Sequence, residues 1–334
     1  MDNANTHTRT HIYKISIMTM IIDALLLIVG MAIVMWGADK FTEGASSVAR
    51  RWKVSEMAIG LTIVSLGTSM PEFVVSFFSA LNGKADMSVG NIVGSNIFNT
   101  LIIVGMSALI ISMSLTKKLL TRDILFVILS SLILASLSYD GNITRADGFI
   151  LLLCFGMYMI YSFYVAKNEP SETEAGGNIY GWGKILLYVV LGLGCLIGGG
   201  QLLVDSATRL AIACGMSERV VGLTILAAGT SLPELATSIV AARKGSKGIA
   251  LGNAIGSNLF NILFILGTSS FICPLSINGI GLLDWVVLIG SAIVLFIFGG
   301  TEHKITKAEG AVMILIYLLY MTALVMGWQI TWPF

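Results

Sequence analysis

The chain has 334 residues, of which 56% are hydrophobic and only 12% are charged, and its mean hydropathy is +0.88. Because charged residues make up about 25% of an ordinary soluble domain, this composition excludes that class and indicates a polytopic membrane protein. The formal net charge is only +1, which gives no reason to expect a nucleic-acid partner. Cys154, Cys195, Cys214 and Cys273 show no CxxC spacing, so we interpret them as buried apolar residues rather than metal or redox groups.

Apolar runs close to the roughly 20 residues that span a bilayer recur along the whole chain. We expect ten membrane-spanning helices, at about residues 18–38, 54–81, 87–112, 121–138, 146–166, 183–204, 217–242, 248–272, 283–299 and 308–328. The runs are continuous and the chain contains 36 glycines, which favours closely packed helices over the short alternating segments of a membrane barrel. The predicted fold class is therefore an all-α integral membrane protein.

The chain also divides into two halves. Its first residues are polar, and the apolar run that follows is of span length, so we expect an N-terminal tail and no cleaved signal peptide, with Met18 or Met20 as alternative starts. The longest hydrophilic interruption between spans follows the fifth predicted helix. We therefore expect a tail, a first five-helix repeat, a cytoplasmic linker and a second five-helix repeat, at residues 1–17, 18–166, 167–182 and 183–334.

A forty-residue segment occurs twice without a gap, at residues 60–99 and 222–261, and 19 of the 40 aligned positions are identical. The offset is constant, so that Gly60 corresponds to Gly222 and Asn99 to Asn261; we call this correspondence the repeat register. Because the two copies begin on predicted helices 2 and 7, an odd number apart, they enter the membrane in opposite directions. We predict two inverted five-helix repeats, an arrangement in which transporters form their binding site at the interface between the halves.

Lysine and arginine collect in the cytoplasmic loops of membrane proteins. The segments that join predicted helices 1 to 2, 3 to 4, 5 to 6, 7 to 8 and 9 to 10 hold 14 of the 20 Lys and Arg residues. We predict a multi-pass protein of the cell (inner) membrane, with both termini outside and the central loop in the cytoplasm.

The motif GTSxPE lies in an apolar span of each copy, with its proline at Pro71 and Pro233. Proline removes one backbone hydrogen bond and crowds the carbonyl four residues earlier. A single proline kink is common in membrane helices, but two in register with glutamates favour a functional break, because irregular backbone at this depth must face protein, water or a cation. We expect helices 2 and 7 to be broken.

The strongest candidate site residues are Glu72 and Glu234, one in each copy. A charged residue in the middle of a membrane helix costs roughly 2.5–3.5 kcal/mol on insertion scales and is a functional candidate by default. No Lys or Arg lies in the adjacent apolar stretch of either glutamate. If the two helices cross at the centre, the paired carboxylates need protons or bound cations.

Other oxygen-bearing side chains lie at helical spacing around each glutamate and on the next predicted helix. The further candidate ligands are Thr68, Ser69, Ser95 and Asn99 in the first copy, and Thr230, Ser231, Ser257 and Asn261 in the second. No His or Cys belongs to the set, which disfavours zinc, copper or iron and favours sodium and calcium. For the remaining motif asparagines we keep a plain alternative, hydrogen bonding between helices: Asn91, Asn96, Asn253 and Asn258.

The duplicated GTSxPE and GSNxFN motifs resemble those of the calcium/cation antiporter superfamily, specifically the prokaryotic sodium/calcium exchanger branch, over nearly the whole chain. The resemblance implies a five-plus-five inverted repeat with cation sites in the middle of the protein. It also implies that Glu72 and Glu234 are shared calcium and sodium ligands, and that Ser65 and Ala227 add backbone oxygens. This chain departs from the family at one point, since Asn99 and Asn261 are both amides where an exchanger often has one acid.

The function implied by the resemblance is antiport of calcium against sodium by alternating access. Both cations would be substrates, with no cofactor and no partner beyond the lipid bilayer. Proton-coupled or potassium-assisted calcium exchange stays open, because glutamates without basic partners could load protons, and a passive cation channel is a third alternative. An enzyme is disfavoured, because there is no HExxH motif and the three histidines, His7, His11 and His303, lie in the tail or a loop.

Overall fold

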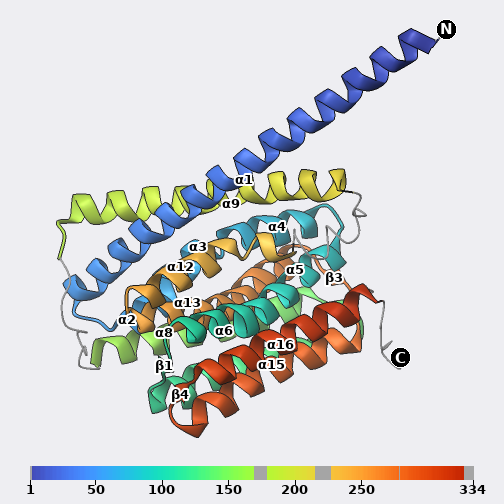
Figure 1. The fold of residues 1–334 in the computed structure, drawn as a ribbon. Coiled ribbons are helices and arrows are strands. Elements are labelled where there is room, and N and C mark those ends of the chain that lie inside the picture. Colours follow the sequence, from blue (N-terminus) through green and yellow to red (C-terminus); the bar gives the residue numbers. More distant parts are fainter. Residues whose placement is uncertain (1, 169–178, 215–226, 278, 327–334) are drawn as a thin grey trace.

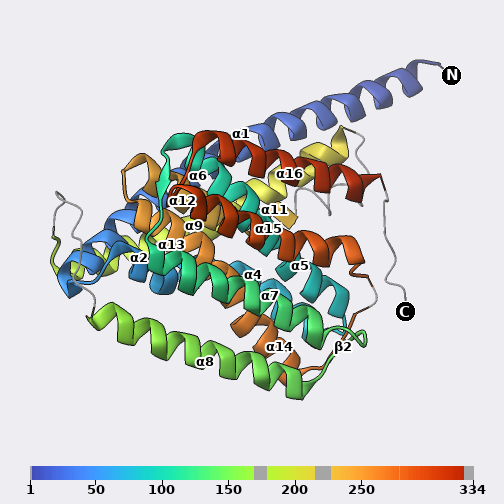
Figure 2. The ribbon, with the colours of Figure 1, turned by 90° about the horizontal axis from the view of Figure 1, so that it is seen from below.

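The computed structural model describes residues 2–168, 179–214, 227–277 and 279–326, with side chains described from Met18 onward. Within these ranges every regular element is helical except for four two-residue strands. Figure 1 shows a bundle of helices with α1 and α9 lying across one face and α15 and α16 at the opposite face. In Figure 2 the helix α8 lies along one flank of the bundle. The predicted all-helical membrane fold is confirmed.

The first half contains helices, wide helical turns (labelled η) and two strands. In chain order these are α1 (Asp2–Trp52), α2 (Glu56–Ile59), η1 (Gly60–Val64), α3 (Ser65–Thr68), α4 (Met70–Leu81), α5 (Ala85–Phe98), η2 (Asn99–Ile103), α6 (Val104–Ile110), β1 (Met113–Ser114), η3 (Leu119–Ile124), α7 (Leu125–Leu137), β2 (Asn142–Ile143) and α8 (Arg145–Asn168).

The second half follows nearly the same order. It contains α9 (Trp182–Ala213), α11 (Ala227–Gly229), α12 (Leu232–Arg243), α13 (Lys247–Leu259), η5 (Phe260–Leu266), α14 (Gly267–Ile272), β3 (Leu275–Ser276), α15 (Leu282–Thr301), β4 (Lys304–Ile305) and α16 (Lys307–Val325). In the repeat register, the first residue of α5 corresponds to that of α13, the first residue of α8 corresponds to that of α16, and β1 coincides with β3.

Eight of the described helices are long and apolar enough to cross a bilayer. A ninth span results if the bent pair Glu56–Thr68 and Met70–Leu81 is counted as one helix, with a 49° bend at Ser69. The predicted span at residues 217–242 falls partly outside the described residues, which resume at Ala227 with α11 and α12. The bend therefore occurs in predicted helix 2, at the residue that precedes Met70 and Pro71.

The helix α1 is longer than the first predicted span, which ends at residue 38. It continues as one helix to Trp52 and also includes residues 2–17, the segment assigned to the N-terminal tail. The charges that end the apolar run do not end the helix, because they are paired: Lys40 contacts Asp39 at 3.0 Å and Glu43 at 3.4 Å. The hydropathy pattern shows where the apolar run ends, but the helix continues beyond that point.

Two long helical segments form the centre of the bundle. In the segments Ala85–Ile110 and Lys247–Ile272, 78% and 94% of the most apolar window is buried, against 17% for the peripheral segment Arg145–Ala166. Glycines let the broken helix approach the second segment closely: a Cβ built on Gly252 would lie 2.9 Å from the Cα of Gly60. The predicted cation ligands therefore lie in the best-packed part of the molecule.

Two short antiparallel sheets link the halves. The strand β1 pairs with β4, with Met113 opposite Ile305, and β2 pairs with β3, with Ile143 opposite Leu275. The repeat register maps one pair onto the other, because Met113 corresponds to Leu275 and Ile143 to Ile305. The two halves are therefore joined by two equivalent strand pairs.

Candidate functional site

The two glutamates occupy equivalent positions directly after a helix break. Glu72 lies in the first turn of α4 and Glu234 in the first turn of α12, and each helix has a proline at its start. Both side chains have 0% relative exposure. A helix N-terminus carries partial positive charge from its free N–H groups, so the break places each carboxylate where the backbone favours a negative charge.

Each carboxylate receives a hydrogen bond from the other copy of the repeat. The Ser231 hydroxyl donates to Glu72 Oε1 at 2.8 Å, and the Ser69 hydroxyl donates to Glu234 Oε1 at 2.9 Å. Among the described residues no Lys or Arg forms an ion pair with either one. A serine at the helix break of each repeat therefore binds the carboxylate of the other repeat.

A second layer of crossed bonds fixes the broken helices to each other. The Thr68 hydroxyl donates to Asn253 Oδ1 at 2.9 Å, while Asn253 Nδ2 donates to the Glu234 carbonyl and to the Ser238 hydroxyl, both at 3.0 Å. In the other half, the Thr230 hydroxyl donates to the Asn91 side chain at 3.2 Å. These asparagines bridge helices, as the plain alternative expected, and they do so at the break itself.

The side chain of Asn91 also donates a hydrogen bond from Nδ2 to the Ser76 hydroxyl at 2.9 Å.

A further amide network lies between the two central segments. Asn261 Nδ2 donates to Asn96 Oδ1 at 3.0 Å, Asn96 Nδ2 donates to the Asn258 carbonyl at 3.2 Å, and Asn258 Nδ2 donates to Thr100 at 2.8 Å. The sequence analysis did not single out Thr100, although it directly follows the GSNxFN motif.

Several buried polar atoms at the centre have no hydrogen-bond partner among the described residues. Those that belong to predicted ligands are Glu72 Oε2, Glu234 Oε2, Ser95 Oγ, Ser257 Oγ, Asn261 Oδ1 and both amide atoms of Asn99. Buried polar groups in native proteins are normally paired, so these unpaired atoms call for an explanation. Its oxygen atoms are lone-pair acceptors, which is what a cation requires of its ligands.

The remaining predicted ligands whose side chains the structure describes are already engaged in hydrogen bonds. The Ser65 hydroxyl donates to the Thr62 carbonyl at 3.1 Å, and the Ser65 carbonyl accepts the Ser69 N–H at 3.0 Å. A carbonyl has two lone pairs, so Ser65 keeps one for another contact. Ala227 is the first residue of α11, and its side chain lies outside the described residues.

The unpaired set provides six side-chain oxygens, one each from Glu72, Glu234, Ser95, Ser257, Asn99 and Asn261. Calcium takes about six to eight oxygen ligands, so the number and the type of donors both suit it. The described residues contain no group of three or more His, Cys, Asp or Glu side chains that could hold a metal. The donor chemistry is that of a site for hard cations, with two carboxylates contributing charge and hydroxyls and amides contributing dipoles.

These observations define a class: a multi-pass helical membrane protein whose duplicated halves meet at two buried glutamates, each hydrogen-bonded by a serine of the other half. The sequence profile of the sodium/calcium exchanger protein family matches residues 22–164 and again residues 184–326. The chain belongs to this family. The two matched ranges coincide in the repeat register, so the family profile matches each half of the duplicated chain once.

Individual relatives cover almost the whole chain. A putative antiporter, CaxA of Alkalimonas amylolytica, is 36% identical over 90% of this chain and 98% of its own length. The sodium/calcium exchanger MaX1 of Methanosarcina acetivorans is 30% identical over 91% of this chain and 98% of its own length. A solved structure of the sodium–calcium exchanger NCX_Mj superposes with a TM-score of 0.80 and 30% identity, covering 91% of this chain and 99% of that one.

Proposed function

We propose that this chain exchanges calcium for sodium across the cell membrane, with both cations competing for one site between Glu72 and Glu234. The observation that carries the proposal is the cluster of buried, unpaired oxygens contributed equally by the two halves. Membership of the sodium/calcium exchanger family and the likeness to NCX_Mj support the same substrates. The ligand set that we propose is the predicted one, led by the two glutamates.

The charge of the site explains why exchange would be obligatory. Two carboxylates balance one calcium ion or two sodium ions, and any further sodium must be held by amide and carbonyl dipoles. An empty site leaves two buried carboxylates without a cation in a medium of low dielectric constant, where an unbalanced charge is costly. A conformational switch that passes through a fully enclosed site is therefore favoured only when a cation is bound. Neither ion can then cross without being exchanged.

The architecture that fits this proposal is a ten-helix inverted repeat with both termini outside and the central loop in the cytoplasm. The serine–glutamate and threonine–asparagine bonds at the breaks occur in crossed pairs between the copies, as expected when two opposed halves share one site. We propose that α1 and α9, which lie across the site helices in Figure 1, move relative to them and expose the cations to each side in turn. Each ion shifts this equilibrium only through its different affinity for the two states.

Calcium uptake into proteoliposomes tests the proposal, with sodium, potassium and proton gradients imposed one at a time. We expect a sodium gradient to drive uptake and the other two to be ineffective. The substitutions E72A and E234A should abolish uptake, whereas E302A, at an exposed glutamate between α15 and α16, should leave it unchanged. Uptake without any counter-ion would indicate a channel, and wild-type exchange in E72A or E234A would refute the site.

A further inference from the structure

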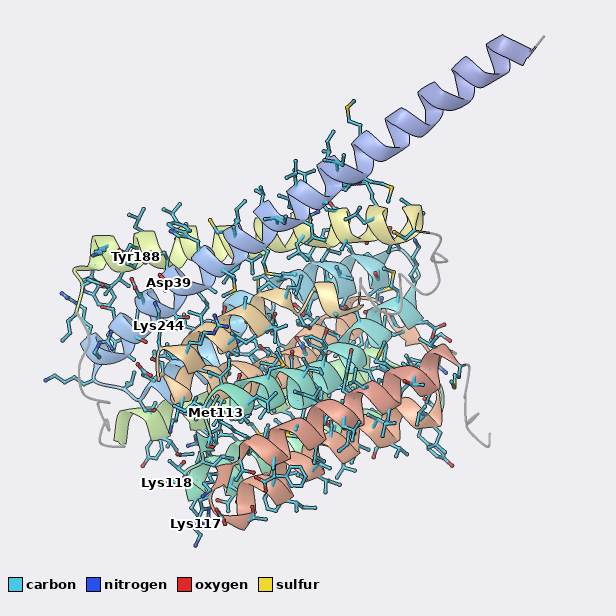
Figure 3. All side chains as sticks on the ribbon, viewed as in Figure 1. Asp39, Met113, Lys117, Lys118, Tyr188 and Lys244 are labelled. Atoms are coloured by element: carbon cyan, nitrogen blue, oxygen red, sulfur yellow. The ribbon has the colours of Figure 1, made fainter. Side chains whose placement is uncertain are left out.

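A cluster of four charged residues connects α1 to α12 at one end of the bundle. Lys244, directly after α12, contacts Asp39 at 2.6 Å and Glu43 at 3.2 Å, and its Nζ also donates to the Asp39 carbonyl at 3.1 Å. Lys40 contacts the same two acids. Lys40 Nζ also lies 5.2 Å from the ring centre of Tyr188 on α9. We call these residues, Asp39, Lys40, Glu43 and Lys244, the ion cluster; Figure 3 labels Asp39, Tyr188 and Lys244.

The packing of α1 and α9 on the site helices is not symmetric. The helix α12 packs against both α1 and α9, whereas its counterpart α4 makes no comparable contact with either helix in the described part of the chain. The two halves therefore have different conformations. The protein is closed between α1 and α12 and less closely packed at the equivalent place near α4.

The ion cluster exists in one half only. In the repeat register, Lys244 corresponds to Asn82, Asp39 to Gln201 and Glu43 to Asp205. The counterpart set has one acid and no base, so it cannot form the same contacts. The lysine occurs on the side that is closed. An inverted repeat changes its facing state by exchanging the conformations of its halves, which would bring α9 onto α4 and release α1 from α12.

We propose that Lys244, through Asp39 and Glu43, holds α1 against α12 and thereby stabilises the state that is closed at the Lys244 face. This inference rests on the proposed function and adds which of the two facing states is the more stable. The exchange of halves breaks the ion cluster and forms no equivalent at the other end. The two facing states are therefore unequal in free energy although the site itself is nearly symmetric.

The consequence is a difference in apparent affinity between the two faces of the membrane. An ion that binds only to a minor state shows an affinity reduced by the population of that state. Calcium arriving at the Lys244 face meets a site that is mostly closed to it, so its half-saturating concentration there is raised. Removing the lysine raises the population that is open at this face and lowers that concentration.

The test compares sodium-driven calcium transport in right-side-out and inside-out membrane vesicles. For K244Q we expect the ratio of half-saturating calcium concentrations, Lys244 face over opposite face, to fall about 3- to 10-fold, the range for a small network of exposed ion pairs. The matched control is R209Q, because Arg209 pairs with Asp23 at 2.7 Å and so joins α9 to α1 without touching α12. We expect R209Q to leave the ratio within twofold of wild type.

The variant K244R keeps the positive charge and should leave the ratio near the wild-type value. Hydrogen exchange of the full-length protein in nanodiscs supplies a second readout, with faster exchange expected at the end of α12 in K244Q and wild-type exchange in K244R. An unchanged ratio and unchanged hydrogen exchange in K244Q would overturn the inference, as would an equal fall in R209Q. If the wild type shows no sodium-dependent calcium flux, the proposed function fails, and the hydrogen exchange still decides whether Lys244 closes this face.

Discussion

The serines at the centre of the protein fall into two groups. Ser69 and Ser231 donate hydrogen bonds to a carboxylate, whereas Ser95 and Ser257 are equally buried and have no partner among the described residues. The first pair stabilises the fold of the site, because it holds the glutamates of opposite halves. The hydroxyl oxygens of the second pair are available to the cation in the proposed site. The two groups should respond differently to the same substitution.

We expect S95A to weaken the apparent calcium affinity by roughly tenfold or more, since a lost ligand to a cation resembles a lost charge-assisted hydrogen bond of about 1.5–3 kcal/mol. Its thermal stability without calcium should equal that of the wild type. In contrast, S69A leaves Glu234 Oε1 without its donor and should lower the free energy of unfolding by about 1–3 kcal/mol. Thermal unfolding with and without calcium measures both effects. Equal destabilisation by the two variants would contradict this division.

The asparagines that bridge the breaks give a second contrast. Asn253 bonds to Thr68, Ser238 and the Glu234 carbonyl, whereas the side chain of Asn91, among the described residues, bonds to Thr230 and Ser76. We expect N253A to destabilise the protein more than N91A does, by roughly 0.5–1.5 kcal/mol for the additional hydrogen bond that is lost. Denaturation midpoints of the two variants in the same detergent check this, and a larger loss in N91A would be inconsistent with it.

At this scale the sequence predicts which residues gather but not how they pair. Helical spacing places Ser69 on the same face as Glu72, three residues away. In the structure the chain bends by 49° at Ser69, and its hydroxyl reaches Glu234 of the other copy. A spacing rule holds only while the helix is continuous. The crossed pairing depends on the relative placement of the two halves, which no local pattern contains.

Among the elements, the broken helix before α4 depends on Pro71. Replacing it with alanine restores a backbone N–H that could bond to the Gly67 carbonyl and continue the helix. We expect P71A to lower the maximal exchange rate severalfold, because a straighter helix moves Glu72 away from the Ser231 hydroxyl. The control is P274A, at a proline outside both breaks. Full exchange activity in P71A would show that the break does not need its proline.

The contact between α13 and the broken helix depends on the absence of side chains. A Cβ built on Gly256 would lie 2.6 Å from the Ser65 hydroxyl and 2.7 Å from the Leu61 carbonyl, distances that real Cβ atoms do not reach. We expect G256A to destabilise the protein by about 1–3 kcal/mol through overpacking and to impair transport. The variant G156A, on α8 with nothing within 4 Å, should be neutral or slightly stabilising. Thermal unfolding distinguishes them, and a neutral G256A would contradict the close contact.

Apolar runs predict most of the helices well, because span length and hydropathy are local properties. They miss the C-terminal part of α1, where Asp39 and Glu43 interrupt the run but are paired with Lys244. They also miss the four strands, since two residues are too few for an alternating pattern. The wide turns η2 and η5, which begin near Asn99 and Asn261, have no sequence signature that could have predicted them. These features are set by contacts between the halves.

For the molecule as a whole, the placement of charge predicts its orientation. Fourteen of the 20 Lys and Arg residues belong to one set of loops, so that side should be cytoplasmic. A reporter that is active only outside the cytoplasm, such as alkaline phosphatase, should be active when fused after Phe334. The same reporter inserted in the central linker, residues 167–182, should be inactive. The reverse pattern would invert the topology and assign Lys244 to the outer face.

The two small sheets have a consequence for assembly. In each sheet one strand comes from the first half and one from the second, and each pair maps onto the other when the halves are interchanged. A contact in which two partners use the same surface reciprocally is isologous, the type found in twofold-symmetric dimers. Two copies of a half-length chain, inserted in opposite orientations, would satisfy both sheets and both crossed serine–glutamate bonds. During synthesis of the present chain, by contrast, neither strand of the first half has a partner until most of the second half is made.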